Sequence, residues 1–290
     1  MTNRAVININ HDIRSVDGKW IQMPRWISGE PDDVWGKLSL PNPHANSSVG
    51  DTIQKYPVGT HFHDGDRDFF YGYVATVYTA NKANIGMFNG KESASGTSTV
   101  TWGATAGVAG DTVVGVLASS LTDTTPDRDD FAGGWLMPRT NPYGSYPVIA
   151  STTATGGRTS GEVDLTLAYG LAEAVTASQG SCFLNFSEWK GLVQHWAGGL
   201  DYATCPGVTL IDPIASTWQW VQSWGPCYVV PYNEEIGATV NNHDCFFHID
   251  GTIKLQTRAA GALNQRAGYM LNSSGSASTS TWLIRLQINK

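Results

Sequence analysis

Short runs of β-branched and aromatic residues, separated by turn residues, follow one another from Val58 almost to the end of the chain. None of these runs has helical spacing, and each is bounded by Gly, Pro, Asn, Asp or Ser, which is typical of strands joined by turns. The pattern predicts an all-β fold, an antiparallel β-sandwich or barrel. The expected strands are Asp68–Tyr78, Ser98–Trp102, Thr112–Leu117, Gly134–Met137, Tyr146–Ala150, Val163–Leu167, Trp218–Ser223, Cys227–Val230 and Trp282–Ile288.

Two other stretches, Leu171–Ala177 and Glu188–Trp196, favour helical turns. The last expected strand alternates so that its apolar residues face one way, which predicts that the C-terminal end is part of a sheet.

Residues 1–50 lack the strand pattern of the rest of the chain, and we expect them to form an extended N-terminal arm. A β-rich domain is expected over residues 51–290. This domain could be divided into two sub-domains near residues 150–160. Prolines punctuate the arm and exclude helix interiors and central strands. Trp20, Trp26 and Trp35 lie among them, and tryptophans are costly to leave in water. They cover either their own domain or a neighbouring subunit, so these three residues form the candidate partner interface.

Charge and hydropathy argue against several functions and locations. The net charge is −7 and no basic cluster is present, which argues against nucleic-acid binding. No apolar stretch is long enough to suggest a membrane span. The first ten residues lack the basic start and apolar stretch of a signal peptide, which predicts synthesis in a cytoplasm.

Two constellations could carry chemistry. His61 and His63 would share a strand face, and Asp64 or Asp66 could complete a metal site. However, Asp64-Gly65 is also an ordinary hairpin turn, and this interpretation is favoured.

The second constellation is Cys245 with His243 and His248. A nucleophilic cysteine needs a base and an electropositive pocket, whereas Cys245 precedes two phenylalanines and is expected to be buried. The four cysteines form no CxxC pair and are expected to be structural thiols.

No nucleophile elbow, phosphate-binding loop or HExxH motif is present. The sequence therefore predicts no enzyme, no cofactor and no metal.

The most distinctive run is Trp218–Trp224. Its tryptophans, Trp218, Trp220 and Trp224, are expected on one strand face, where they form either the core or a platform that stacks on sugars. We favour the core, with Gln219, Gln222 and Ser223 less buried.

Several motifs occur in the order found in a family of virion proteins from tailed phages, cyanophages and marine phages among them. The run Trp220–Cys227 resembles the family's (Y/F)WIQTWGPC signature, and Gly65–Tyr71 is similar to its GDRxFxY start. Further similarities, from about residue 57 onward, are Phe131–Leu136 followed by Tyr146–Ile149, Val163–Leu167, Ile236–Val240 and the C-terminal Ser280–Ile288. Residues 1–50 match no family element, and Asn233–Glu235 replaces a shorter turn.

The resemblance implies a capsid decoration (cement) protein. Such a protein binds the outside of the major capsid protein lattice of a tailed phage, forms a homotrimer and reinforces the shell, so its location would be the capsid exterior of the virion. The alternative is a receptor- or glycan-binding module of a head fibre or tail, acting through Trp218, Trp220 and Trp224.

Overall fold

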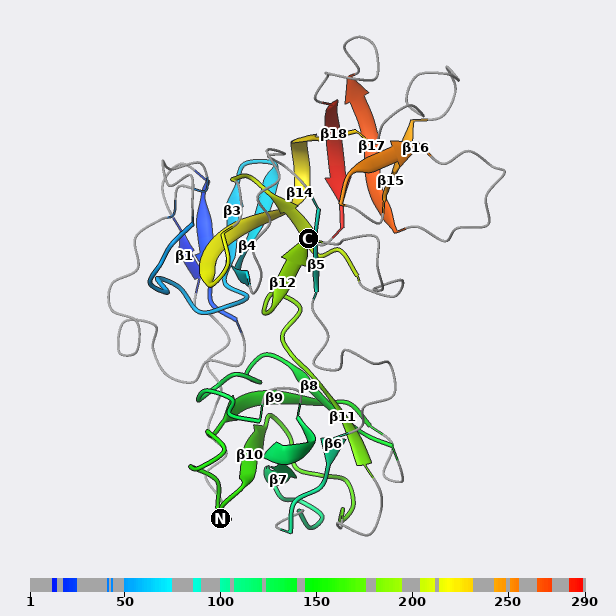
Figure 1. Cartoon of the computed structure of the whole chain (residues 1–290). Helices are drawn as coiled ribbons and strands as arrows, with labels where there is room; N and C mark the ends of the chain where they lie inside the picture. The colour runs from blue at the N-terminus through cyan, green and yellow to red at the C-terminus, as the bar shows by residue number, and fades with distance from the viewer. Residues whose placement is uncertain are drawn as a thin grey trace. The chain divides into compact units, whose positions relative to one another are not determined.

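In the computed structural model, the regular secondary structure of the described residues is β (Figure 1), apart from one 3₁₀ turn at Ala118–Ser120. The all-β, antiparallel prediction is confirmed. The structure describes residues 12–14, 18–24, 41, 43, 50–74, 86–89, 100–104, 107–121, 124–139, 144–175, 181–194, 204–211, 214–231, 243–248, 251–255, 265–272 and 282–288.

The chain forms two compact units. The first contains Met1–Met23, Gly29–Gly90 and Trp189–Lys290, and the second contains Lys91–Glu188 together with Pro24–Ser28. The sub-domain division suggested near residues 150–160 falls inside the second unit, between two strands that pair with each other. The sequence could not reveal this, because turn residues mark a loop without showing which strands it joins.

The first unit holds a twelve-stranded sheet in the order β1-β2-β3-β4-β12-β5-β13-β14-β18-β17-β15-β16. Its strands are β1 (Asp12–Arg14), β2 (Trp20–Gln22), β3 (His61–Asp64), β4 (Arg67–Val74), β5 (Gly86–Asn89), β12 (Leu192–Gln194), β13 (Gly207–Thr209), β14 (Thr217–Val229), β15 (Asp244–Phe247), β16 (Ile253–Leu255), β17 (Arg266–Asn272) and β18 (Trp282–Gln287).

Strand β14 connects the two halves of this sheet. Its first half pairs with β4, from Thr217 opposite Val74 to Trp224 opposite Asp68. Its second half, from Trp224 to Val229, pairs with β18. Because β4 and β14 pair directly, β4, β12, β5, β13 and β14 also close a ring of strands. The packing around β14 therefore determines how the first unit holds together.

The second unit is a six-stranded antiparallel sheet that curls into a barrel. Its order is β6 (Val100–Thr101), β11 (Ser181–Asn185), β8 (Trp135–Pro138), β9 (Tyr146–Ser151), β10 (Glu162–Leu167) and β7 (Val113–Leu117). The two ends of the sheet meet, because Trp102 bridges to Val116 and the Gly103 N–H donates to the Gly115 carbonyl at 2.8 Å. Alternate residues of the strands fill the interior, including Leu136, Val148, Leu165 and Leu184.

Two predictions about local structure are wrong. Residues 192–194 of the stretch Glu188–Trp196 form strand β12, preceded by a turn, and the described part of Leu171–Ala177 contains no helical turn. Apolar residues without a clear period do not separate a short strand from a helical turn.

Part of the predicted arm lies within the large sheet of the first unit. Residues 12–14 and 20–22 are strands of the large sheet, and Ile21 and Met23 are buried in the first unit. The strands β1 and β2 therefore belong to the fold of the first unit rather than to a separate arm.

The barrel is an insertion in a hairpin of the first unit. Strands β5 and β12 pair in antiparallel fashion, with Asn89 directly opposite Leu192. Residues opposite each other in such a pair have Cα atoms about 4.5–5.5 Å apart. The chain therefore leaves the first unit and returns to it at almost the same point.

We predict that each unit folds without the other. Residues 91–188, expressed alone, should unfold cooperatively, because the barrel has its own buried core and closed hydrogen bonding. Replacing Lys91–Glu188 by a short Gly/Ser linker should leave a folded first unit, because the two hairpin ends already meet. Urea unfolding followed by circular dichroism measures the cooperativity of both proteins, the isolated barrel and the first unit without it. A broad, non-cooperative transition in either protein would contradict the prediction.

Candidate interaction surface

Trp20 lies on its own unit. Strand β2 pairs with β3, so that Trp20 is opposite His63. The Trp20 ring stacks on the His63 ring at 5.2 Å and meets the His61 ring edge-on at 4.6 Å. Trp20 therefore covers its own domain, which was one of the two alternatives for the arm tryptophans. Trp26 and Trp35 lie outside the described residues.

His61 and His63 share one buried carboxylate. Nε2 of His61 and Nδ1 of His63 each lie 2.8 Å from Oδ1 of Asp68. Burial alone would raise the pKa of Asp68, but the hydrogen bonds and charges of the two histidines outweigh it and leave this pKa below its usual value. This His–Asp–His cluster therefore holds a carboxylate in its charged form under the Trp20 ring.

The two predicted metal ligands other than the histidines lie elsewhere. Asp64 contacts Arg67 at 3.0 Å and Lys19 at 3.4 Å, and the largely exposed Asp66 lies 3.9 Å from Arg285. Within the part of the chain that the structure describes, no group of three or more His, Cys, Asp or Glu side chains is arranged to hold a metal ion. The favoured interpretation of Asp64-Gly65 as part of a hairpin turn is confirmed, since β3 and β4 are joined by Gly65 and Asp66.

We predict that Asp68→Asn lowers the free energy of unfolding by about 1.5–3 kcal/mol at pH 7, because it weakens two hydrogen bonds to a charged acceptor. Since the folded-state pKa of Asp68 is lowered, its contribution is present above the unfolded pKa, near pH 4, and is lost as the pH falls through the folded pKa. Urea unfolding from pH 7 down to pH 3 should show the two proteins converging at low pH.

The control for this prediction is Asp66→Asn in the adjacent turn, because the Asp66 side chain is 57% exposed. This change should alter stability by about 0.5 kcal/mol or less. A wild-type advantage over Asp68→Asn that persists unchanged at pH 3 would contradict the proposed role of the carboxylate charge.

The three tryptophans of β14 do not share one face. Trp218 and Trp220 are opposite Tyr73 and Tyr71 of β4, but the register shifts between Gln222 and Trp224. The extra residue at this bulge turns Trp224 to the other face. The prediction of a single aromatic face is therefore wrong. Of the three, only Trp220 is buried, while Trp218 and Trp224 are partly buried.

The polar residues of the same run are buried, contrary to expectation. Gln219, Gln222 and Ser223 are each exposed by 3% or less. The Gln222 side-chain amide donates to the carbonyl of Trp224 at 2.9 Å and to that of Pro226 at 2.8 Å. These two bonds tie the Gln222 side chain to the backbone on both sides of Gly225. The Trp220–Cys227 run therefore contains the bulge and bend at which β14 changes its partner from β4 to β18.

The cysteines are buried thiols. Cys205, Cys227 and Cys245 belong to one apolar core cluster and Cys182 to the barrel core, and all four are free. Burial raises the pKa of Cys182, Cys227 and Cys245 to about 12 and raises that of Cys205 further. A thiol in this state supplies almost no thiolate at neutral pH, which argues against Cys245 as a nucleophile.

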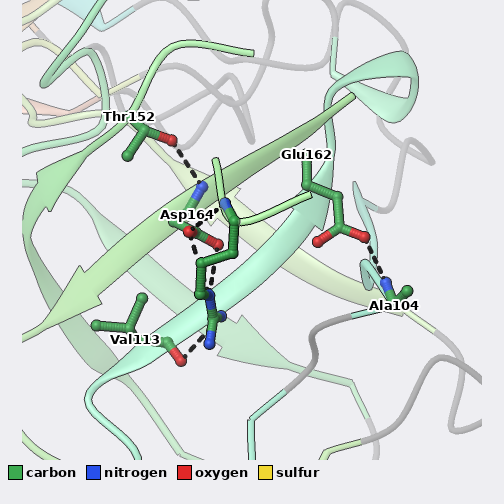
Figure 2. Close-up of polar contacts among 6 residues, drawn as sticks. Ala104, Val113, Thr152, Glu162 and Asp164 are labelled. Atoms are coloured by element: carbon green, nitrogen blue, oxygen red, sulfur yellow. Dashed lines mark hydrogen bonds and ion pairs between the residues drawn. The ribbon is translucent and has the colours of Figure 1, made fainter. Parts of the chain in front are cut away.

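One flank of the barrel is covered by the chain itself. Figure 2 shows two outward-facing but buried acids of β10 in their polar contacts. Glu162 accepts a hydrogen bond from the Ala104 N–H at 2.6 Å. Asp164 accepts from the Arg158 N–H at 2.8 Å and pairs with its guanidinium, which also donates to the Val113 carbonyl. These contacts hold the loop that contains Arg158 over β10 and β7.

The opposite side of the barrel carries an apolar flank, formed by Trp135, Met137, Pro147 and Phe183. These residues are neighbours, because Met137 is opposite Phe183 and Trp135 is opposite Pro147 on paired strands. Trp135 is 46% and Phe183 is 41% exposed. The Arg139 guanidinium lies 5.5 Å from the Phe183 ring centre, in cation–π geometry.

Sequence reasoning missed the apolar flank. The alternation around Trp135 and Leu136 predicted a strand, but alternation does not say which face is inside until the strand pairing is known. The remaining large exposed apolar residues of the described chain are Ile53, Val108, Tyr169, Ile214, Tyr228 and Leu271. Among the described residues, no helix has the length and apolar character needed to cross a membrane.

No protein-family model, curated protein or solved structure matches this chain.

Proposed function

We propose that this chain is a virion structural protein that binds the outside of a tailed-phage capsid and stabilises the major capsid protein lattice. The observation that carries the proposal is the apolar flank, a surface of the barrel on which Trp135 and Phe183 are exposed beside the partly buried Met137. Such a surface suits binding to another protein rather than catalysis.

The phage-like motifs support the same proposal through their structural roles. The Gln222 side chain stabilises the bend of β14, and Gly225 has φ +88° where the bend passes the β3–β4 turn. A shell component needs a durable scaffold with contact surfaces, and these motif residues contribute to the scaffold. We further propose that the protein acts as a homotrimer without cofactor or nucleic acid.

The alternative, a glycan- or receptor-binding module, required Trp218, Trp220 and Trp224 to form one sugar-stacking surface, and they do not share a face. Trp220 is buried, and Trp224 is on the face opposite to Trp218 and Trp220. The three side chains therefore cannot stack side by side on one sugar chain. This favours the decoration protein over the receptor module.

Electron microscopy of particles of the phage that encodes this chain tests the proposal. We expect density for the barrel and the twelve-stranded sheet on the outer surface of the head, above the major capsid protein. Heads assembled without the chain should release DNA at a lower temperature. Density only at a fibre or tail tip would favour the receptor module, and absence from the particle would contradict both functions.

A further inference from the structure

The strand pair β1–β2 lies at one end of the twelve-stranded sheet. Among the described strands, β2 pairs only with β1 and β3. On one face of β2, Trp20 covers the His–Asp–His cluster, and on the other face Ile21 lies opposite Phe62 and is 1% exposed. Lys19 lies 3.4 Å from Asp64. The edge of β3 with these contacts is therefore an acceptor site for one strand, held on both faces.

The strand that fills the acceptor site is far from it along the chain. Strand β2 ends at Gln22, whereas β3 begins at His61. The chain between Pro24 and Gly50 can span up to about 80–90 Å when fully extended. Covalent geometry therefore allows β2 to reach the β3 strand of its own chain or that of an adjacent copy.

We propose that β1–β2 is an exchangeable strand pair, and that the acceptor site on β3 binds the β2 strand of a second copy of this chain. The second copy is the occupant because its β2 carries the same Trp20, Ile21 and Lys19. The backbone pairing, the buried side chains and the ion pair are then all repeated. Only the connection differs, and exchange of an identical element is a low-cost route to an oligomer.

Concentration decides between the two arrangements. A tethered strand competes with the strands of other chains at an effective concentration on the order of millimolar or below, which falls as the tether lengthens. Dilute protein therefore keeps β2 on its own β3, whereas copies crowded to that concentration exchange it. The role of this exchange rests on the proposed function, because a capsid lattice supplies the crowding. Strands passed from each copy to the next would close the homotrimer.

Disulfide trapping in the full chain tests the exchange. One chain carries Lys19→Cys, and a differently tagged chain carries Asp64→Cys. The β2–β3 register, continued by one residue, places these positions opposite each other, where Cα atoms are about 4.5–5.5 Å apart, as a disulfide requires. The native thiols do not compete, because they are buried and their pKa values are raised. In a glutathione redox buffer, we expect the interchain disulfide to increase about tenfold or more between about 10 µM and 1 mM protein.

Two controls separate strand exchange from random collision. Arg128→Cys replaces Asp64→Cys in the first, because the Arg128 side chain is 85% exposed and meets other chains more readily. It should give about tenfold less linked product at about 1 mM. In the second, Ile21→Ser is added to the chain with Lys19→Cys. The linked product should again fall about tenfold or more, because the weakened strand competes with the intact β2 of the accepting chain.

Each outcome supports or overturns the proposal. Lys19→Cys and Asp64→Cys combined in one chain should form an intrachain disulfide at about 10 µM, and failure to form it overturns the acceptor site. Linked product that does not exceed the Arg128→Cys control, or that Ile21→Ser leaves unchanged, overturns the exchange. Capsid binding of the wild-type chain is measured separately. A failure of the exchange therefore leaves the proposed function standing, and a failure to bind capsids leaves the exchange standing.

Discussion

Replacing Trp220 with alanine should lower the free energy of unfolding of the first unit by about 3–5 kcal/mol, the range for large aromatic residues removed from a core. The Trp220 ring is buried and meets the rings of Tyr56 and Tyr71 at 5.1 Å and that of Phe62 at 5.8 Å. These rings come from three segments of the chain, so the cavity left by alanine would disrupt packing that joins β3, β4 and β14.

Urea unfolding followed by circular dichroism measures this effect. The matched control is Tyr228→Ala, because Tyr228 lies on the same strand but is 56% exposed. It should lose about 0.5 kcal/mol or less. Similar losses for the two variants would mean that Trp220 is not a core residue.

The second large effect is expected for Gly225→Ala. Gly225 has φ +88°, and a Cβ atom there would lie 2.2 Å from the carbonyl oxygen of Asp66 and 3.0 Å from Cα of Arg67. These are backbone atoms of the β3–β4 hairpin, so they cannot move aside as a flexible side chain would. The variant should lose more than the roughly 1–2 kcal/mol that a left-handed conformation costs a residue with a side chain.

Gly65→Ala separates these two contributions. Gly65 also has a positive φ, +67°, but nothing lies within 4 Å of a Cβ atom built there. It should therefore show only the conformational cost. If both variants lose the same stability in urea unfolding, the close approach of β14 to the hairpin has no energetic importance.

Strands and turns could be predicted from the sequence because their signals are local. The alternation in Trp282–Gln287 gave the buried face of β18 correctly, with Trp282, Ile284 and Leu286 inside. The His–Asp–His cluster was also within reach of local reasoning. A two-residue turn at Gly65-Asp66 places His63 opposite Asp68, and counting along the hairpin from this turn would have identified the carboxylate.

The remaining features depend on distant parts of the chain. The sequence around Gly225-Pro226 indicates an interruption, yet β14 continues through it because β4 supplies partners before the bend and β18 after it. The bulge that turns Trp224 to the opposite face arises from the same change of partner. The apolar flank could not be located because a closed barrel, not the strand itself, determines which face is outside.

The position of the barrel within the β5–β12 hairpin also affects the order in which the chain folds during synthesis. Strands β3 and β4 emerge from the ribosome early, but β14, the main partner of β4, follows the whole barrel. Contacts between residues so far apart in sequence form slowly, because a long loop must close first. The barrel pairs only strands within Val100–Asn185 and can complete its core first. We therefore expect the barrel of the nascent chain to be folded while the edge of β4 that pairs with β14 is still unpaired. A chaperone that shields this edge would then raise the yield of folded protein.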